Sequence, residues 1–164
     1  MHSNNMESVW TEMQGHVYGK EMMNADIYPG VLNFLGLAQE LSVELYIVSH
    51  KTKFPYKGPK YDLRNIAKEW IFSKLISKAH SYFNDSNIFF LETKDQKVSK
   101  ISDLKCDIFV DDLPEILMHQ QFPSNTKKAL FDPESHYNHS EFDNVTRYSS
   151  WDNLMMLLKG YHGS

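Results

Sequence analysis

The sequence predicts an α/β fold, a Rossmann-like, doubly wound parallel sheet flanked by helices. Short apolar runs of strand-forming residues alternate with longer segments whose apolar residues recur at helical spacing. This alternation is typical of βαβ units, whose connections are nearly always right-handed. A chain of 164 residues suggests a single domain, 1–164, that can bury a sizeable core. We expect the polar residues 1–8 to be disordered.

The predicted strands are short and rich in Val, Ile, Leu and Phe. Such runs are typical of strands that are buried on both faces of a parallel sheet. They span residues 45–48, 88–91, 107–110, 128–131 and 145–148.

The segments between the strands predict helices. Tyr28-Pro29-Gly30 marks the start of a helix that ends near residues 40–42, and Asp62 is placed to cap a helix whose apolar face extends to Ile76. We expect four further helices. These are a weak helix over residues 9–23, a short helix around 98–104, a helix over 113–118, and a last helix that starts at 151 and is capped by Ser149 or Ser150.

Composition narrows the classes of function. The net charge of −4 and the pI of about 6.0 argue against a general nucleic-acid surface. No apolar run approaches the length of a membrane span, and the N-terminus does not resemble a signal peptide. The single cysteine, Cys106, cannot form an internal disulfide. These features together predict a cytoplasmic protein without a membrane or nucleic-acid partner.

The most informative stretch runs from Cys106 to Leu117 and reads CDIFVDDLPEIL. An apolar strand ends there in two adjacent acids, Asp111 and Asp112. Ligands of open α/β folds bind at this carboxyl edge, and paired carboxylates that repel each other suit a cation such as Mg²⁺. The alternative is a solvated helix start in which Asp112 is the N-cap.

Other polar residues are expected near the same edge. Ser49 follows the strand 45–48, and Lys97 and Lys100 lie on the helix that leads into the acidic strand. A hydroxyl, an ammonium group and a carboxylate pair are the groups that a phosphate monoester with Mg²⁺ requires. His50 and Lys51 either line this pocket beside Ser49 or belong to a solvated loop, and the sequence favours neither.

These residues resemble the motifs of the haloacid dehalogenase (HAD)-like phosphohydrolases. LYIVSHKT, and later KVSKISDLKCDIFVDDLPEIL, carry the likeness, which covers roughly residues 25–158. Ser49 matches the family's second motif, Lys97 the third with Lys100 as the other choice, and the two acids the fourth. The resemblance implies a phosphatase that hydrolyses a phosphorylated small molecule with Mg²⁺.

The chain departs from the family at the first motif. That motif is a strand carrying Asp-x-Asp, whose first Asp is the nucleophile and whose second protonates the leaving group. Residues 1–28 hold no such strand, and Asp26 stands alone. Either a front end is missing, or the protein binds its ligand without hydrolysing it, and we expect little or no turnover. Residues 131–134, FDPE, either imitate the motif in a permuted order or simply form a turn.

The strand that carries this motif is normally central to the sheet. Its loss leaves unpaired strand edges, which favour association with another chain. The alternative function is therefore a non-catalytic interaction protein on the same scaffold, acting as a homodimer or with a partner that donates a strand.

Overall fold

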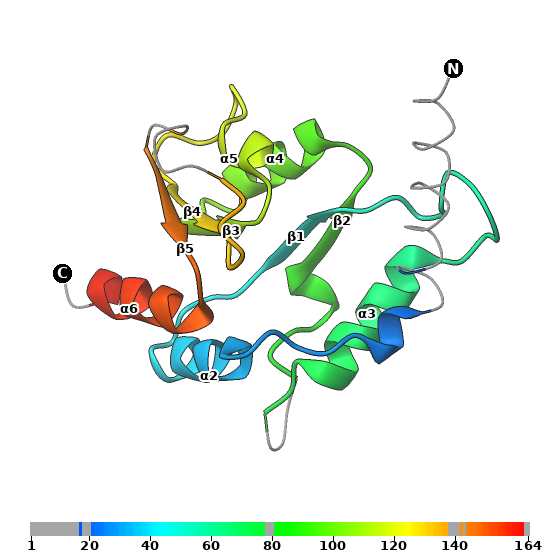
Figure 1. The fold of residues 1–164 in the computed structure, drawn as a ribbon, viewed down its shortest axis with the longest axis horizontal. Coiled ribbons are helices and arrows are strands. Elements are labelled where there is room, and N and C mark those ends of the chain that lie inside the picture. Colours follow the sequence, from blue (N-terminus) through cyan, green and yellow to red (C-terminus); the bar gives the residue numbers. More distant parts are fainter. Residues whose placement is uncertain (1–16, 18–20, 78–80, 138–141, 143, 163–164) are drawn as a thin grey trace.

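The computed structural model describes residues 17, 21–77, 81–137, 142 and 144–162. Its elements alternate between helices and strands (Figure 1). In chain order they are η2 (Met22–Asn24), α2 (Val31–Glu40), β1 (Ile47–His50), α3 (Leu63–Lys74), η3 (Asp85–Asn87), β2 (Ile88–Leu91), α4 (Lys94–Asp103), β3 (Ile108–Asp111), α5 (Pro114–Leu117), β4 (Lys127–Phe131), β5 (Val145–Tyr148) and α6 (Trp151–His162).

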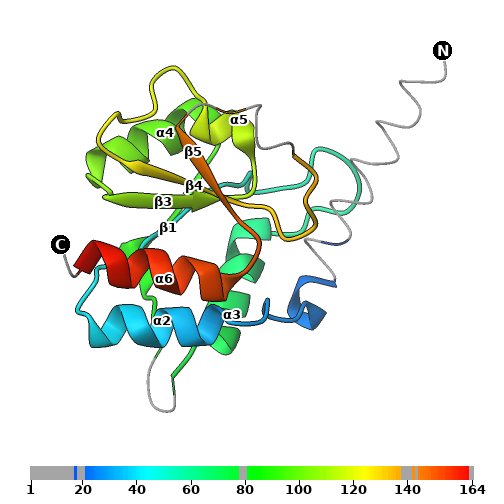
Figure 2. The same ribbon diagram turned by 60° about the vertical axis from the view of Figure 1, so that its left-hand side comes forward.

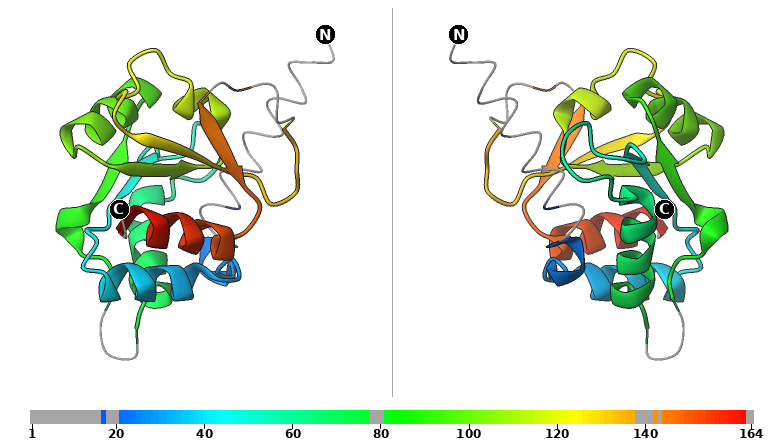
Figure 3. Two further views of the ribbon diagram at one scale, coloured as in Figure 1. Left: turned by 90° about the vertical axis from the view of Figure 1, so that its left-hand side faces the viewer. Right: turned by 90° about the vertical axis from the view of Figure 1, so that its right-hand side faces the viewer.

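Every pair of neighbouring strands is parallel, which confirms the α/β class with helix-flanked parallel strands. The layout is compatible with a Rossmann-like arrangement. The sequence predicts one sheet, however, whereas the named strands form two. β1 pairs with β2, and β3, β4 and β5 pair in that order. Figure 3 shows that the strands of the two sheets run in clearly different directions.

The helices lie on both sides of the larger sheet (Figure 2). On one side, α4 contacts both β1 and β2, and α5 contacts β3 and β4. On the other side, α6 contacts β5 and α2 packs along α6. The α4 helix buries Val98 and Ile101 completely, so it is held by its apolar face rather than by its largely polar sequence.

The buried side chains form two separate clusters. One joins α4, α5, β3 and β4 and includes Ile101, Phe109 and Leu130. The other joins α2, α3 and the start of β2 and includes Leu35 and Ile71. The domain therefore has two buried clusters, and the first also contains Val48 of β1 and packs against Phe89 and Leu91 of β2, so it contacts both sheets.

Several sequence predictions agree with these elements. The helix after Gly30 and the strands 88–91 and 145–148 are found as expected. Asp62 caps α3 by accepting a hydrogen bond from the Asn65 N–H at 3.0 Å. Ser150 caps α6 by accepting one from the Asn153 N–H at 3.2 Å.

Other predictions need correction. β1 begins at Ile47, not at residue 45, because pairing with β2 begins with Ile47 opposite Ile88; Ser49 consequently lies within the strand. Asp112 is not a helix cap. Leu113 is the N-cap residue of α5, without a side-chain cap, and Pro114 at the first helical position sets the start of this short helix.

The helix expected over residues 9–23 falls mostly outside the described residues, as does the segment 1–8. Met22–Asn24 forms a short 3-10 turn. Across the described ranges, no helix is both long and apolar enough to cross a bilayer.

Candidate functional site at the carboxyl ends of the strands

Lys97 and Asp111 meet at the carboxyl end of β3. Lys97 lies near the start of α4, whose N-cap Thr93 accepts a hydrogen bond from the Gln96 N–H at 3.2 Å. The Lys97 Nζ donates to Asp111 Oδ2 at 2.5 Å, and the two side chains are only 9% and 4% exposed. A buried charge of either sign requires a partner, and each of these residues supplies the other's.

Burial dominates the electrostatics of Asp111. It raises the pKa of this carboxyl above the ordinary value, and the Lys97 ammonium and the Leu113 N–H, which donates to Oδ1 at 3.1 Å, offset this only in part. The neighbouring Asp112 carboxylate raises the same pKa further. The Lys97 Nζ also lies 5.6 Å from the centre of the Phe109 ring, close enough for a cation–π contact.

The carboxyl end of β1 lies beside that of β2. In the strand register, Ser49 is opposite Phe90 and His50 is opposite Leu91. His50 Nε2 is 2.9 Å from the carbonyl oxygen of Glu92, and the Lys51 N–H donates to the Leu91 carbonyl. His50 is therefore held against the β2 end, while burial lowers the pKa of Lys51.

The three strand ends converge through α4. This helix starts directly after β2, contacts β1, and carries Lys97 to Asp111 at the end of β3. Ser49 belongs to this edge and is half-buried, but among the described contacts it bonds to neither Lys97 nor Asp111. The structure therefore joins the predicted lysine and acid directly and places the serine on β1, in the other sheet.

Lys100 occupies a different position. Its Nζ lies 4.0 Å from Asp103 and 4.9 Å from the centre of the Phe89 ring. It lines a polar depression together with Arg64 and Glu92, whose side chains form an ion pair at 2.5 Å. Lys97, and not Lys100, is thus the lysine that contacts the acidic strand end.

Arg64 and Glu92 were missed by the sequence analysis. Glu92 directly follows the strand Ile88–Leu91, the same pattern that drew attention to Asp111, and could have been found in that way. Arg64 lies in the first turn of α3 and carried no comparable signal.

The residues at this edge do not fit a magnesium ion held by the protein alone. Both Asp111 oxygens already accept hydrogen bonds, one of them from an ammonium group. In the part of the chain that the structure describes, no three His, Cys, Asp or Glu side chains are grouped so as to hold a metal. Asp112 is exposed and provides a single further carboxylate. Magnesium binding therefore stays a prediction of the sequence.

Asp132 also follows a strand, β4, and is buried. Its carboxylate accepts hydrogen bonds from the N–H groups of His136 at 2.9 Å and Tyr137 at 3.2 Å, and Arg147 lies 3.4 Å away. These contacts close the turn after β4. They favour the turn interpretation of residues 131–134 over a permuted motif.

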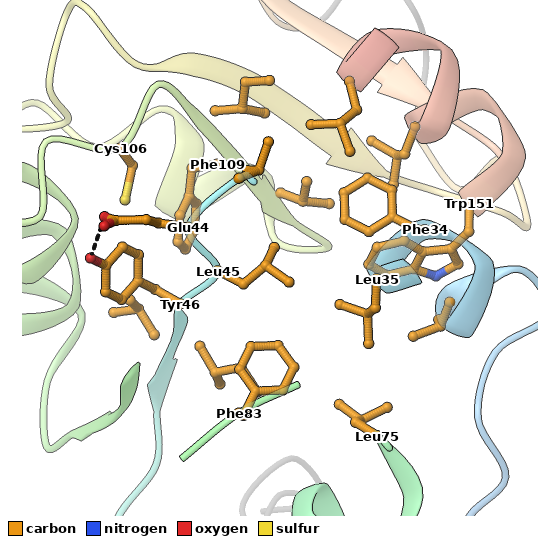
Figure 4. Close-up of a pocket in the computed structure, with 18 of the residues that line it drawn as sticks. Phe34, Leu35, Glu44, Leu45, Tyr46, Leu75, Phe83, Cys106, Phe109 and Trp151 are labelled. Atoms are coloured by element: carbon orange, nitrogen blue, oxygen red, sulfur yellow. Dashed lines mark hydrogen bonds between the residues drawn. The ribbon is translucent and has the colours of Figure 1, made fainter. Parts of the chain in front are cut away.

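A cavity of about 750 Å³ lies between the two sheets (Figure 4). We call it the inter-sheet cavity. Its lining is mostly apolar and includes Leu35, Leu45, Phe83, Phe109 and Trp151. Ser49, Lys97 and Asp111 are not among the lining residues, so the cavity is distinct from the polar edge.

No protein-family model matches the chain, and comparisons with curated proteins and with solved structures found no match.

Proposed function

We propose that this chain is a HAD-like phosphate-binding domain that holds a phosphorylated small molecule at the carboxyl edge of β1 and β3 without hydrolysing it. The observation that carries the proposal is the buried contact between Lys97 and Asp111. A buried ammonium at the carboxyl end of parallel strands is placed where α/β proteins receive anionic ligands. The HAD-like resemblance implies that Lys97 binds the phosphate and that Asp111 is a metal ligand beside it.

Each residue has a distinct part in this proposal. Lys97 supplies a point charge for the phosphate, and Asp111 holds the lysine in position. Ser49 supplies a hydroxyl that makes no hydrogen bond within the described residues and can donate one to a phosphate oxygen. His50 and Lys51 extend the edge next to it.

The same contacts argue against turnover. Hydrolysis needs a carboxylate nucleophile, which the resemblance places in the absent first motif, and Asp111 does not replace it freely because both its oxygens are hydrogen-bonded. The Asp132 carboxylate likewise accepts hydrogen bonds from the backbone of the turn after β4. A binding domain therefore accounts for these carboxylates better than a phosphohydrolase does.

Calorimetry with inorganic phosphate and a panel of phosphomonoesters tests the proposal. We expect saturable binding that falls about tenfold or more in Lys97→Gln, because a charge-assisted hydrogen bond is lost. Lys100→Gln, on the same helix but away from Asp111, is the matched control and should bind normally. Ser49→Ala, which leaves the ion pair intact, should weaken binding by a smaller factor.

Phosphate release from the same panel, measured with Mg²⁺ present, tests the lack of turnover. We expect none above background. Robust release that disappears in Asp111→Ala would restore the enzyme interpretation. Binding that is equal in the wild type and in the Lys97 and Ser49 variants would remove the phosphate site.

A second function is favoured by the division of the strands into two sheets. Among the described residues, β1 and β3 are each paired on one side only, and unpaired edges promote association. We therefore keep a non-catalytic interaction protein, working as a homodimer or with a strand-donating partner, as the second candidate. Light scattering after size-exclusion chromatography measures whether the chain self-associates.

A further inference from the structure

We propose that the inter-sheet cavity receives an extended apolar segment of another polypeptide, which pairs in parallel with both β1 and β3 and joins the two sheets into one. The inference rests on the second proposed function, whose partner class it names. The side chains of the phosphate site, Ser49, Lys97 and Asp111, do not line this cavity, although β1 carries Ser49 and β3 carries Asp111.

The cavity is lined by strand edges and not only by strand faces. Alternate residues of a strand point to opposite faces of its sheet, so a cavity against one face touches every second residue. Here every residue from 44 to 48 and every residue from 104 to 110 lines the cavity. The first run includes the start of β1, and the second run includes most of β3. Each of these strands lies at the end of its own sheet. The unpaired sides of β1 and β3 therefore face the same space.

These edges determine the chemistry of the occupant. An edge strand carries a row of unpaired N–H and C=O groups, and such groups are costly to leave without partners in apolar surroundings. An apolar small molecule would fit the volume of the cavity, but it cannot supply hydrogen bonds at the spacing of a backbone. An extended peptide can pair with one strand along each of its edges.

The geometry of the strands fits a single inserted segment. β1 and β3 each have four residues, which sets the upper limit of the paired part, and the residues that line the cavity are Ile47 and Val48 of β1 and Ile108, Phe109 and Val110 of β3. Neighbouring strands are rotated by about 20–25° relative to each other. A segment between β1 and β3 would thus take an intermediate orientation between the two sheets, whose different directions are visible in Figure 3.

The apolar character of the cavity lining determines which side chains the inserted segment should carry. The walls are aliphatic and aromatic, as Figure 4 shows around Leu45, Phe83 and Phe109. Trp151 also lines the cavity, and its indole N–H is buried without a hydrogen-bond partner among the described residues.

Charge at the lining favours basic flanks on the segment. Three carboxylates, those of Asp26, Glu44 and Asp107, belong to the lining, and the Tyr46 hydroxyl donates to Glu44 at 2.9 Å. Lys105 is the lysine among the lining residues. We therefore expect four apolar residues bordered by lysine or arginine.

The probe is an array of synthetic peptides in which four central residues, varied among valine, isoleucine, leucine, phenylalanine and alanine, lie between lysine pairs. We expect a subset to bind the full chain saturably. N-methylation of alternate central residues blocks pairing along one edge while keeping the side chains. It should weaken the selected peptides by about tenfold or more.

Two protein variants locate the binding. Ile108→Lys puts a charge into the cavity lining and should abolish binding, whereas Ile76→Lys, at an exposed residue that does not line the cavity, should not change it. Hydrogen exchange on the wild-type protein gives a readout that needs no variant. Bound peptide should slow exchange in β1 and β3 and leave β5, the other end of its sheet, unchanged.

The proposal is overturned if no peptide of the array binds, if the N-methylated peptides bind as well as their parents, or if the protected amides are those of β5. A homodimer that leaves exchange in β1 and β3 unchanged would retain the interaction function and exclude strand insertion. Loss of phosphate binding with retained peptide binding would remove the first proposed function alone.

Discussion

The Lys97 ammonium lies 2.5 Å from the Asp111 carboxylate although the two residues are fourteen positions apart in the chain. Lys97 belongs to α4, which packs on β1 and β2, whereas Asp111 ends β3 in the other sheet. This ion pair therefore connects the two sheets at their carboxyl edge.

Removing one partner of the pair should be more harmful than removing both. Lys97→Met leaves a buried carboxylate uncompensated and is expected to lower the free energy of unfolding by about 3–5 kcal/mol. Lys97→Met/Asp111→Leu replaces the pair with apolar side chains and should recover most of that loss. Urea unfolding of the wild type, both single variants and the double variant measures the coupling. A double variant as unstable as Lys97→Met alone would contradict the assignment.

The free energy of unfolding should depend on pH through the protonation of Asp111. Its folded-state pKa is raised above the ordinary 3.8, so the folded protein holds this proton more tightly than the unfolded chain. The resulting stabilisation is fully present below pH 3.8 and is lost as the pH rises through the raised folded-state pKa.

Asp111→Asn keeps a neutral side chain at every pH and serves as the reference. The free energy of unfolding of the wild type minus that of this variant should fall as the pH rises above 3.8. A difference that grows with pH would mean that the Lys97 ammonium outweighs burial.

Magnesium alone should bind weakly or not at all. Asp111 is already paired with Lys97, and its neighbour Asp112 is a single exposed carboxylate. Titration calorimetry of the wild type with MgCl₂ should therefore show no saturable heat. Saturable heat that vanishes in Asp111→Ala and Asp112→Ala would instead support the magnesium site that the sequence suggests.

Gly30 should not tolerate a side chain. It precedes α2 with a φ of +86°, and a Cβ there would lie 2.9 Å from the Trp151 Cβ on α6. Gly30→Ala should cost about 1–3 kcal/mol, since it adds a clash to an unfavourable backbone conformation. Gly160→Ala is the matched control, because it lies within α6 with open space around its Cβ position. That change should be neutral or stabilise by up to about 1 kcal/mol, and thermal unfolding distinguishes the two.

Local signals in the sequence predicted most of the elements. The caps Asp62 and Ser150 and the strand 145–148 are found as expected, because helix starts and apolar runs depend on residues within one or two turns of each other. The start of β1 was misplaced by two residues. Its first paired residue is set by Ile88, which is far away in the sequence.

Longer-range packing decided the rest. The sequence by itself placed two lysines on the helix before the acidic strand, and the family resemblance preferred Lys97 while leaving Lys100 as the second choice. Tertiary structure separated them, because Lys97 is buried against Asp111 at the end of β3 whereas Lys100 lies beside Asp103. The division into two sheets and the cavity between them were also decided at this level. Edge pairing depends on which backbones meet in space, and residue patterns along one chain do not specify that.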